Sequence, residues 1–236
     1  MNFPNAQKGI SKIIIASIVS IVATVIIDVF VFAQDLALAV PKTPANNAAN
    51  AAANAAAQVN PDTDTAKHLG YIVIVGIVIM VAACVIKIIG LWQAGQDEKF
   101  FKYALYTLAL SICGNFFVRL IPDNQLHTRE YVYCAFTLVA LVYTIFIIQG
   151  VIGLAKKKNN AVMEKKSVFI FELMTVLYML MLVLKVVSVV VRDTAEKGTK
   201  LAIEVGYVLI SVVAFFIILS LLLNAKKMLT EQNGQE

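Results

Sequence analysis

The chain has 236 residues, of which 60% are hydrophobic and 15% are charged, and its formal net charge is +5. Together with a mean hydropathy of +0.80, this balance excludes a water-soluble globular domain. The lysines and arginines stand in short clusters beside apolar runs rather than along one broad face, so the positive charge indicates no nucleic-acid partner.

Six apolar runs, each about 20 residues long, occupy most of the chain, and a helix of this length crosses roughly 30 Å of hydrocarbon. They predict an all-α, six-transmembrane-helix bundle that forms a single membrane domain over residues 1–236, with the lipid bilayer as its partner. The expected spans are residues 13–33, 71–92, 103–121, 131–154, 168–191 and 201–223.

The first run also has features of a cleaved signal peptide. Lys8 and Lys12 precede it, and Ala37-Leu38-Ala39 follows it as a small-residue cleavage pattern. Its apolar core is longer than the roughly 7 to 15 residues of a signal peptide, which favours a retained span.

The connection over residues 34–67 is the longest, and we expect it to lie outside the cytoplasm. Its middle is an Ala/Asn-rich stretch in which Asn46, Asn50, Asn54 and Gln58 recur every four residues. Alanine favours helix and this spacing places the amides along one stripe, whereas the polar, weakly hydrophobic composition is also typical of a flexible tether. Both interpretations stay open.

The later spans are joined by short connections, which predicts antiparallel helical hairpins with inner turns at residues 93–100 and 155–167. Ile89-Gly90-Leu91 and Ile152-Gly153-Leu154 close two of the spans in the same way. Three tandem hairpins would produce this echo, and so would the topology alone.

Small residues follow one face of the third span, where close backbone approach stabilises helix pairs in lipid. This pattern predicts that the third span packs centrally in the bundle. The helix-packing residues are Ala104, Thr107, Ser111 and Gly114.

Positive residues indicate the orientation, because they are retained on the cytoplasmic side. With the N-terminus inside, the inner segments hold eleven lysines and the outer segments seven lysines and arginines. The connection over residues 155–167 is the clearest, with five lysines against Glu164 alone. We expect a multi-pass protein of the cell membrane with both termini in the cytoplasm.

Charged residues inside the spans are the strongest functional signals, since each is unfavourable in hydrocarbon unless it is paired or hydrated. Counting about 1.5 Å per residue from the span ends places them in two layers. The pattern predicts a path for a small solute or ion between two gates, with Asp28 and Lys185 pairing across the first and fifth spans. The inner layer is Lys87, Gln149 and Glu172, and the outer layer is Asp28, Lys185 and Glu204.

A structural role for the same residues is the alternative. Lysines at this depth can extend their apolar stems to the membrane surface, and ion pairs can serve only to fix helix register. The second function is therefore a non-catalytic scaffold or accessory subunit that binds another membrane protein or a second copy of the chain.

No catalytic, metal or cofactor motif is present in the sequence. His68 and His127 stand near span ends without a zinc-binding pattern, and Cys84, Cys113 and Cys134 form no Cys-x-x-Cys pair. The sequence therefore predicts neither an enzyme nor a cofactor.

Overall fold

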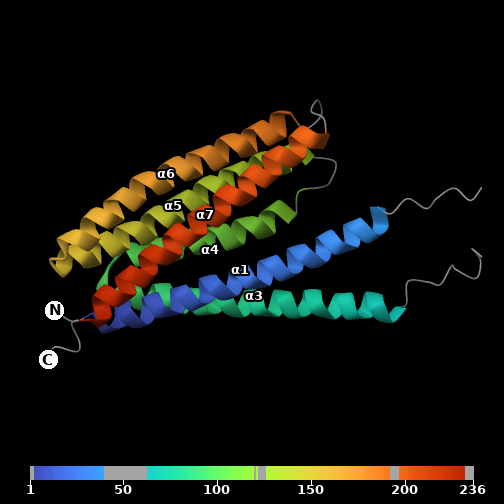
Figure 1. The fold of residues 1–236 in the computed structure, drawn as a ribbon. Coiled ribbons are helices and arrows are strands. Elements are labelled where there is room, and N and C mark those ends of the chain that lie inside the picture. Colours follow the sequence, from blue (N-terminus) through green and yellow to red (C-terminus); the bar gives the residue numbers. More distant parts are fainter. Residues whose placement is uncertain (1–2, 40–62, 120, 122–125, 192–196, 232–236) are drawn as a thin grey trace, which may run out of the picture. The chain divides into compact units, whose positions relative to one another are not determined.

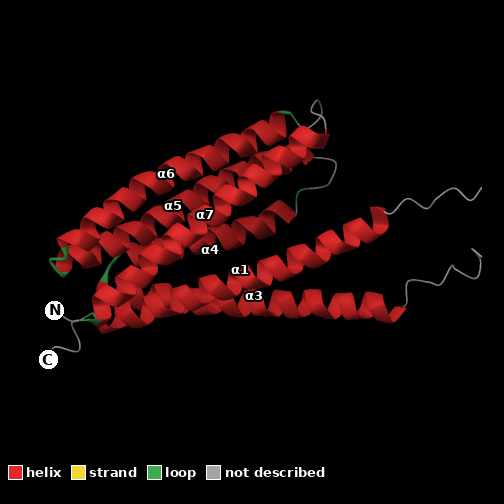
Figure 2. Ribbon diagram, viewed as in Figure 1, coloured by secondary structure: helices red, strands yellow, loops and turns green. Residues whose placement is uncertain are grey.

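Six helices and no strand make up the part of the chain that the computed structural model describes, which is residues 3–39, 63–119, 121, 126–191 and 197–231 (Figure 1). Figure 2 shows the same arrangement by secondary structure. The helices are α1 (Pro4–Ala39), α3 (Thr63–Asp97), α4 (Phe100–Arg119), α5 (Leu126–Lys157), α6 (Ala161–Val190) and α7 (Lys197–Thr230).

Five of these helices are long and apolar enough to cross a membrane, and α4 contributes a shorter apolar helix, Phe100–Gly114. The helices are hydrophobic nearly all round, as expected for segments that face both protein and lipid. The all-α class is confirmed, and the fold is that of a multi-pass membrane protein.

Most helices extend beyond the predicted spans. At the long connection, α1 continues to Ala39 and α3 begins at Thr63, so helix occupies both ends of the predicted loop over residues 34–67. The Ala/Asn-rich stretch between them lies outside the described residues. At the other end of α3, the helix continues to Asp97, about five residues past the predicted span.

The turn between α5 and α6 has a defined local cause. Asn159 adopts φ 53°, a left-handed conformation that asparagine tolerates better than most residues. The next residue, Asn160, caps α6, because its side-chain oxygen accepts a hydrogen bond from the Met163 amide at 2.9 Å. This turn follows α5 directly and sets α6 antiparallel to it.

The chain divides into two compact units. Unit 1 comprises Met1–Ile14 and Lys87–Glu236, and unit 2 comprises Ile15–Ile86. The helices α1 and α3 run through both units, and the single membrane domain stays a prediction. Unit 2 contains an apolar pocket of about 210 Å³ lined by Ala23, Ile26, Tyr71, Val75, Gly76 and Ile79.

In unit 1, α5 packs against α4, α6 and α7, and α6 also packs against α7. The central position predicted for the third span stays a prediction, and among α4 to α7 it is α5 that contacts the other three helices. Its buried residues, such as Ile147, Ile148 and Val151, join a core with Phe101 of α4 and Leu221 of α7. Of the small residues of α4, Gly114 approaches the Phe136 ring of α5.

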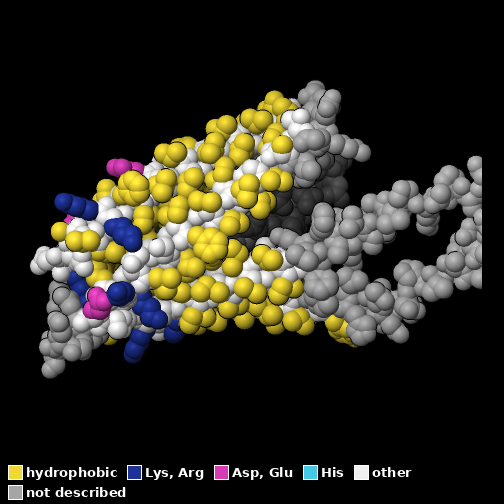
Figure 3. Space-filling model, viewed as in Figure 1, with side chains coloured by type: hydrophobic (Ala, Val, Ile, Leu, Met, Phe, Trp, Pro, Cys, Tyr) yellow, Lys and Arg dark blue, Asp and Glu magenta, His cyan; other side chains and the backbone are white. Residues whose placement is uncertain are grey.

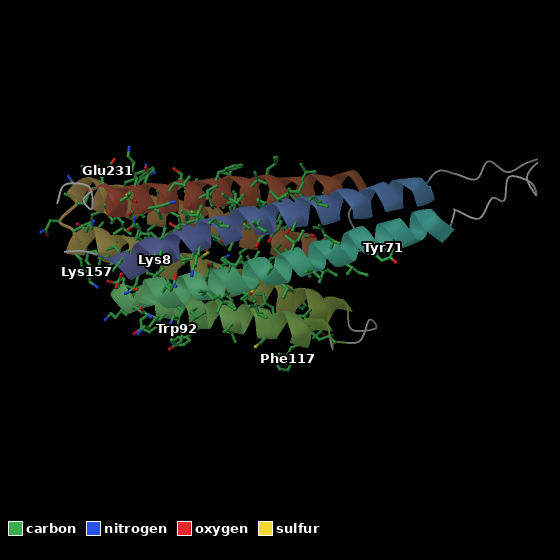
Figure 4. The ribbon with its side chains drawn as sticks, turned by 90° about the horizontal axis from the view of Figure 1, so that it is seen from below. Lys8, Tyr71, Trp92, Phe117, Lys157 and Glu231 are labelled. Atoms are coloured by element: carbon green, nitrogen blue, oxygen red, sulfur yellow. The ribbon has the colours of Figure 1, made fainter. Side chains whose placement is uncertain are left out.

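One end of unit 1 holds both chain termini and two turns. The Gln7 Nε2 atom donates to Thr230 Oγ1 at 3.1 Å, which joins the beginning of α1 to the end of α7. Figure 4 shows Lys8, Lys157 and Glu231 at this same end. Charged side chains gather here, while hydrophobic side chains cover the helices beyond (Figure 3). The sequence predicts an even number of membrane crossings. Such a number requires both termini at one end of the bundle.

Candidate functional site

Lys87 of α3 lies in the apolar part of unit 1 and contacts an aromatic ring. Its side chain is half-buried, and Nζ lies 5.0 Å from the centroid of the Tyr143 ring on α5. Because α3 continues to Asp97, Lys87 is about ten residues, or about 15 Å, from the helix end. Its depth in the membrane, roughly 8 to 9 Å from the end of the predicted span, stays a prediction.

Next to this contact, α5 and α6 are joined by a hydrogen bond inside the bundle. The Thr144 hydroxyl and the Tyr178 hydroxyl are 2.9 Å apart, and Thr144 is buried. Thr144 Oγ1 also lies 2.9 Å from the Ala140 carbonyl oxygen, to which it donates its proton. Tyr178 is consequently the donor to Thr144, and its own oxygen keeps free acceptor capacity.

Lys185 of α6 repeats the arrangement of Lys87. Its side chain is half-buried, and Nζ lies 4.9 Å from the centroid of the Tyr207 ring on α7. A lysine over an aromatic face is attracted by the ring quadrupole. Both spanning lysines are thus held against a tyrosine of a neighbouring helix.

Tyr178 lies near the tyrosine rings of both contacts. Lys87, Tyr143 and Tyr207 all lie close enough to Tyr178 to interact with it electrostatically. We call this group the lysine–tyrosine cluster: Lys87, Tyr143, Thr144, Tyr178, Lys185 and Tyr207. It offers ammonium and hydroxyl groups and, among the described side chains, contains no carboxylate. Chemically it suits an anion or a ligand rich in hydrogen-bond acceptors.

The inner layer that we predicted holds one carboxylate, Glu172. Glu172 is exposed on α6, and among the described residues it forms no ion pair with Lys87. A role for Glu172 in a solute path stays a prediction. Gln149 is half-buried on α5.

The predicted outer pair is untested. Asp28 lies in α1 and Glu204 in α7, and both side chains are outside the described part of the structure. A contact of Asp28 with Lys185 stays a prediction, as does a role for Glu204.

The predicted packing residues of α4 do include close contacts. Ala104 and Gly114 are buried, and a Cβ on Gly114 would overlap the Phe136 ring of α5. Thr107 and Ser111 are half-buried, and Thr107 Oγ1 donates within its own helix to the carbonyl oxygens of Tyr103 and Ala104.

A second polar group lies at the end of unit 1 that carries the turns. Lys157 Nζ lies 2.7 Å from Glu98 Oε2 and donates to the Asp97 carbonyl oxygen, also at 2.7 Å. Asp97 in turn accepts from the Ala6 amide at 2.6 Å and from Asn5 Nδ2 at 3.2 Å. We call these five residues the polar end.

Glycines allow the helices to approach at the polar end. A Cβ on Gly153 would overlap the buried Glu98 side chain, and a Cβ on Gly9 would overlap the Gly90 carbonyl oxygen. Gly90 and Gly153 are the two glycines of the sequence echo. Each makes room for a neighbour, and this requirement accounts for the echo whether or not the hairpins arose by duplication.

The structure gives no metal or redox site within its described part. No group of three or more His, Cys, Asp and Glu side chains there could hold a metal ion. The three cysteines are free thiols.

Sequence reasoning found both lysines of the cluster but missed its tyrosines, because it searched the spans for charge alone. Tyr143, Tyr178 and Tyr207 were visible as aromatic residues with a polar atom inside apolar runs. When buried, a tyrosine hydroxyl usually finds a hydrogen-bond partner, so each was a candidate polar site.

Comparisons with known proteins give no relative from which a role could be transferred. No family model, no curated protein and no solved structure matches this chain.

Proposed function

We propose that this integral membrane protein binds a small anionic solute among its helices, as a binding or transport component for that solute. One observation carries the proposal: both spanning lysines lie against tyrosines around the Tyr178–Thr144 hydrogen bond. The ring contacts hold each ammonium group against the bundle, whereas a snorkelling lysine extends toward the membrane surface.

Energetic considerations favour an anion as a partner for the two lysines of the cluster. A lysine in a spanning helix is unfavourable by roughly 2.5 to 3.5 kcal/mol at the helix centre and by less toward the ends, and a desolvated cation–π contact contributes about 2 kcal/mol or less. An anion beside these donors would form charge-assisted hydrogen bonds, which are about twice as strong as neutral ones.

Thermal unfolding in dodecyl maltoside tests the proposal directly. Sodium chloride, nitrate, acetate and phosphate are compared at constant ionic strength, because a ligand that binds only the folded state raises Tm. We expect at least one anion to raise the Tm of the natural protein and of Lys165→Met, which removes an exposed lysine outside the cluster. The gain should be lost in Lys87→Met. An equal gain in Lys87→Met would refute a role for the cluster.

A second candidate function is an accessory subunit for another membrane protein, and Glu172 favours it. This carboxylate is exposed on α6 about eleven residues from the start of the helix, where hydrocarbon contact is unfavourable. A donor on a partner helix would satisfy it. If so, Glu172→Gln should weaken chemical cross-linking to that partner in native membranes while leaving anion binding unchanged.

We also propose that the charged end of unit 1 faces the cytoplasm, as the positive-inside bias predicts. Ala161 is exposed at the start of α6. In a cysteine-free background, Ala161→Cys should react with an impermeant thiol reagent only after the membrane is opened. Strong labelling of intact cells would invert the topology.

A further inference from the structure

The Lys185 end of the lysine–tyrosine cluster opens into a pocket between α6 and α7. The pocket is half-enclosed, has a volume of about 300 Å³, and is lined by Leu184, Lys185, Ser188, Ile203, Tyr207 and Val208. Pockets for small molecules measure roughly 300 to 1,000 Å³, so this one suits a compact ligand or the head of a longer one.

One side of the pocket is polar and rich in hydrogen-bond donors. Lys185 and Ser188 are three residues apart, which places them one above the other on the same face of α6. Tyr207 closes this side from α7, with its ring under the Lys185 ammonium group. One cation and two residues with hydroxyl groups line this side, and such donors suit an anion.

The other side of the pocket is apolar and faces outward. Val208 lines the pocket and is 57% exposed, and its neighbours Val205 and Leu209 on α7 are 49% and 60% exposed. On α6, Val183 is 56% exposed. In a membrane-spanning helix such side chains contact lipid chains, so the pocket is bordered by hydrocarbon rather than by water. An anion that arrives with its own apolar chain matches both sides.

We propose that this pocket binds the phosphate or carboxylate head of a membrane amphiphile, with the acyl chain along the exposed face of α7. Lys185 and Ser188 hold the head, and Tyr207 positions the Lys185 ammonium group. This inference rests on the proposed function, because it names the class of anion that the same cluster takes.

Native mass spectrometry of the detergent-solubilised protein tests the inference. The protein is mixed with equimolar dioleoyl phosphatidylglycerol and dioleoyl phosphatidylcholine, which differ in head group but share their chains. We expect about tenfold more phosphatidylglycerol adduct in the natural protein, because both lipids carry the phosphate but the choline cation of phosphatidylcholine is repelled by the Lys185 ammonium group. Lys165→Met should keep this preference, and Lys185→Met should abolish it.

Two conservative variants test the site without removing its charge. Lys185→Arg should retain the preference, and Ser188→Ala should reduce it severalfold. These two variants decide the outcome if Lys185→Met does not fold, because an unchanged preference in Ser188→Ala together with a loss in Lys185→Arg would contradict the assigned contacts.

In a separate experiment, sodium phosphate replaces the lipids, and the thermal unfolding of the protein is measured. Phosphate stabilisation without a phosphatidylglycerol preference would overturn the amphiphile and leave the anionic-solute proposal standing. Equal retention of the two lipids, or a phosphatidylglycerol preference that persists in Lys185→Met, would also overturn the inference. If neither lipid nor any small anion binds through the cluster, both proposals fail.

Discussion

The polar end and the lysine–tyrosine cluster use the same cation in different ways. At the polar end, Lys157 meets the Glu98 carboxylate and a backbone carbonyl oxygen, so its charge is compensated. In the cluster, Lys87 and Lys185 meet aromatic rings, and no described carboxylate compensates them. A compensated charge holds helices together, whereas an uncompensated one can still bind a ligand. This difference supports our proposal that the cluster binds a ligand, whereas the polar end joins helices.

The largest expected effect comes from filling the helix crossing beside the polar end. In Gly9→Val the new side chain would overlap the Gly90 backbone and Ala94, so α1 must move away from α3. We expect a loss of about 3 kcal/mol or more in the free energy of unfolding, measured by SDS titration of mixed micelles. The control is Gly206→Val, where the nearest atom, Leu184 Cδ1, is 3.7 Å away. Similar losses in both variants would mean that the crossing is not tightly packed.

Removing the compensating lysine at the polar end should have the next largest effect. Lys157→Met leaves the buried Glu98 carboxylate without its partner, and such a break is unfavourable by about 3 kcal/mol. Adding Glu98→Gln should recover part of the loss, as seen by the same titration. Lys156→Met is the matched control, because its 3.7 Å pair with Glu164 is exposed and worth under about 1 kcal/mol. If both variants lose the same free energy of unfolding, the ion pair at the polar end contributes no more than an ordinary surface ion pair.

A double-mutant cycle measures how strongly the cluster holds its lysine. For Lys185→Met and Tyr207→Leu we expect a coupling free energy of about 1 kcal/mol, since the contact is half-buried. The exposed contact of Lys99 with Phe100, at 6.0 Å, provides the comparison and should couple by about 0.5 kcal/mol or less. Purely additive effects at Lys185 would indicate a snorkelling side chain, and the functional proposal would lose its support.

The smallest effect concerns pH. Lys158 donates to the Met228 carbonyl oxygen at 3.3 Å, and burial lowers the pKa of its ammonium group below 10.5. The unfolded chain therefore binds more protons between the lowered pKa and 10.5, and the free energy of unfolding should rise with pH across that window. In Lys158→Met this contribution to the pH slope should vanish. An unchanged slope would mean that Lys158 is as hydrated in the folded protein as in the unfolded chain.

Much of the fold followed from the length of the apolar runs. Bilayer thickness constrains a spanning helix so strongly that every predicted span coincides with a helix, and short polar segments marked the two inner turns. Helix ends were less predictable. The first turns of α1 are polar, yet they are helical. Their residues Asn5 and Gln7 form side-chain hydrogen bonds with residues far along the chain. A sequence pattern contains no information about such distant partners.

The sequence predicted how deep the candidate residues lie in the membrane, but not the direction in which their side chains point. Glu172 and Lys87 were matched because residue counts placed them in one layer, yet Glu172 is exposed and Lys87 contacts Tyr143. In a soluble helix, the polar face would have shown which way Glu172 points. The neighbours Phe169 and Val176 of Glu172 are apolar and 63% and 64% exposed, so in a membrane helix hydrophobicity does not distinguish the lipid face from the core.

The position of Asp97 has a consequence for biosynthesis. Its carboxylate accepts a hydrogen bond from the Ala6 backbone amide in the first turn of α1, where the helix dipole favours a negative charge, but Asp97 stands 91 residues later in the chain. A nascent α1 therefore leaves the ribosome with its first turn uncapped, and only completed synthesis of α3 supplies the acceptor. The contact between the beginning of α1 and the end of α3 can therefore form only after both helices have been synthesised.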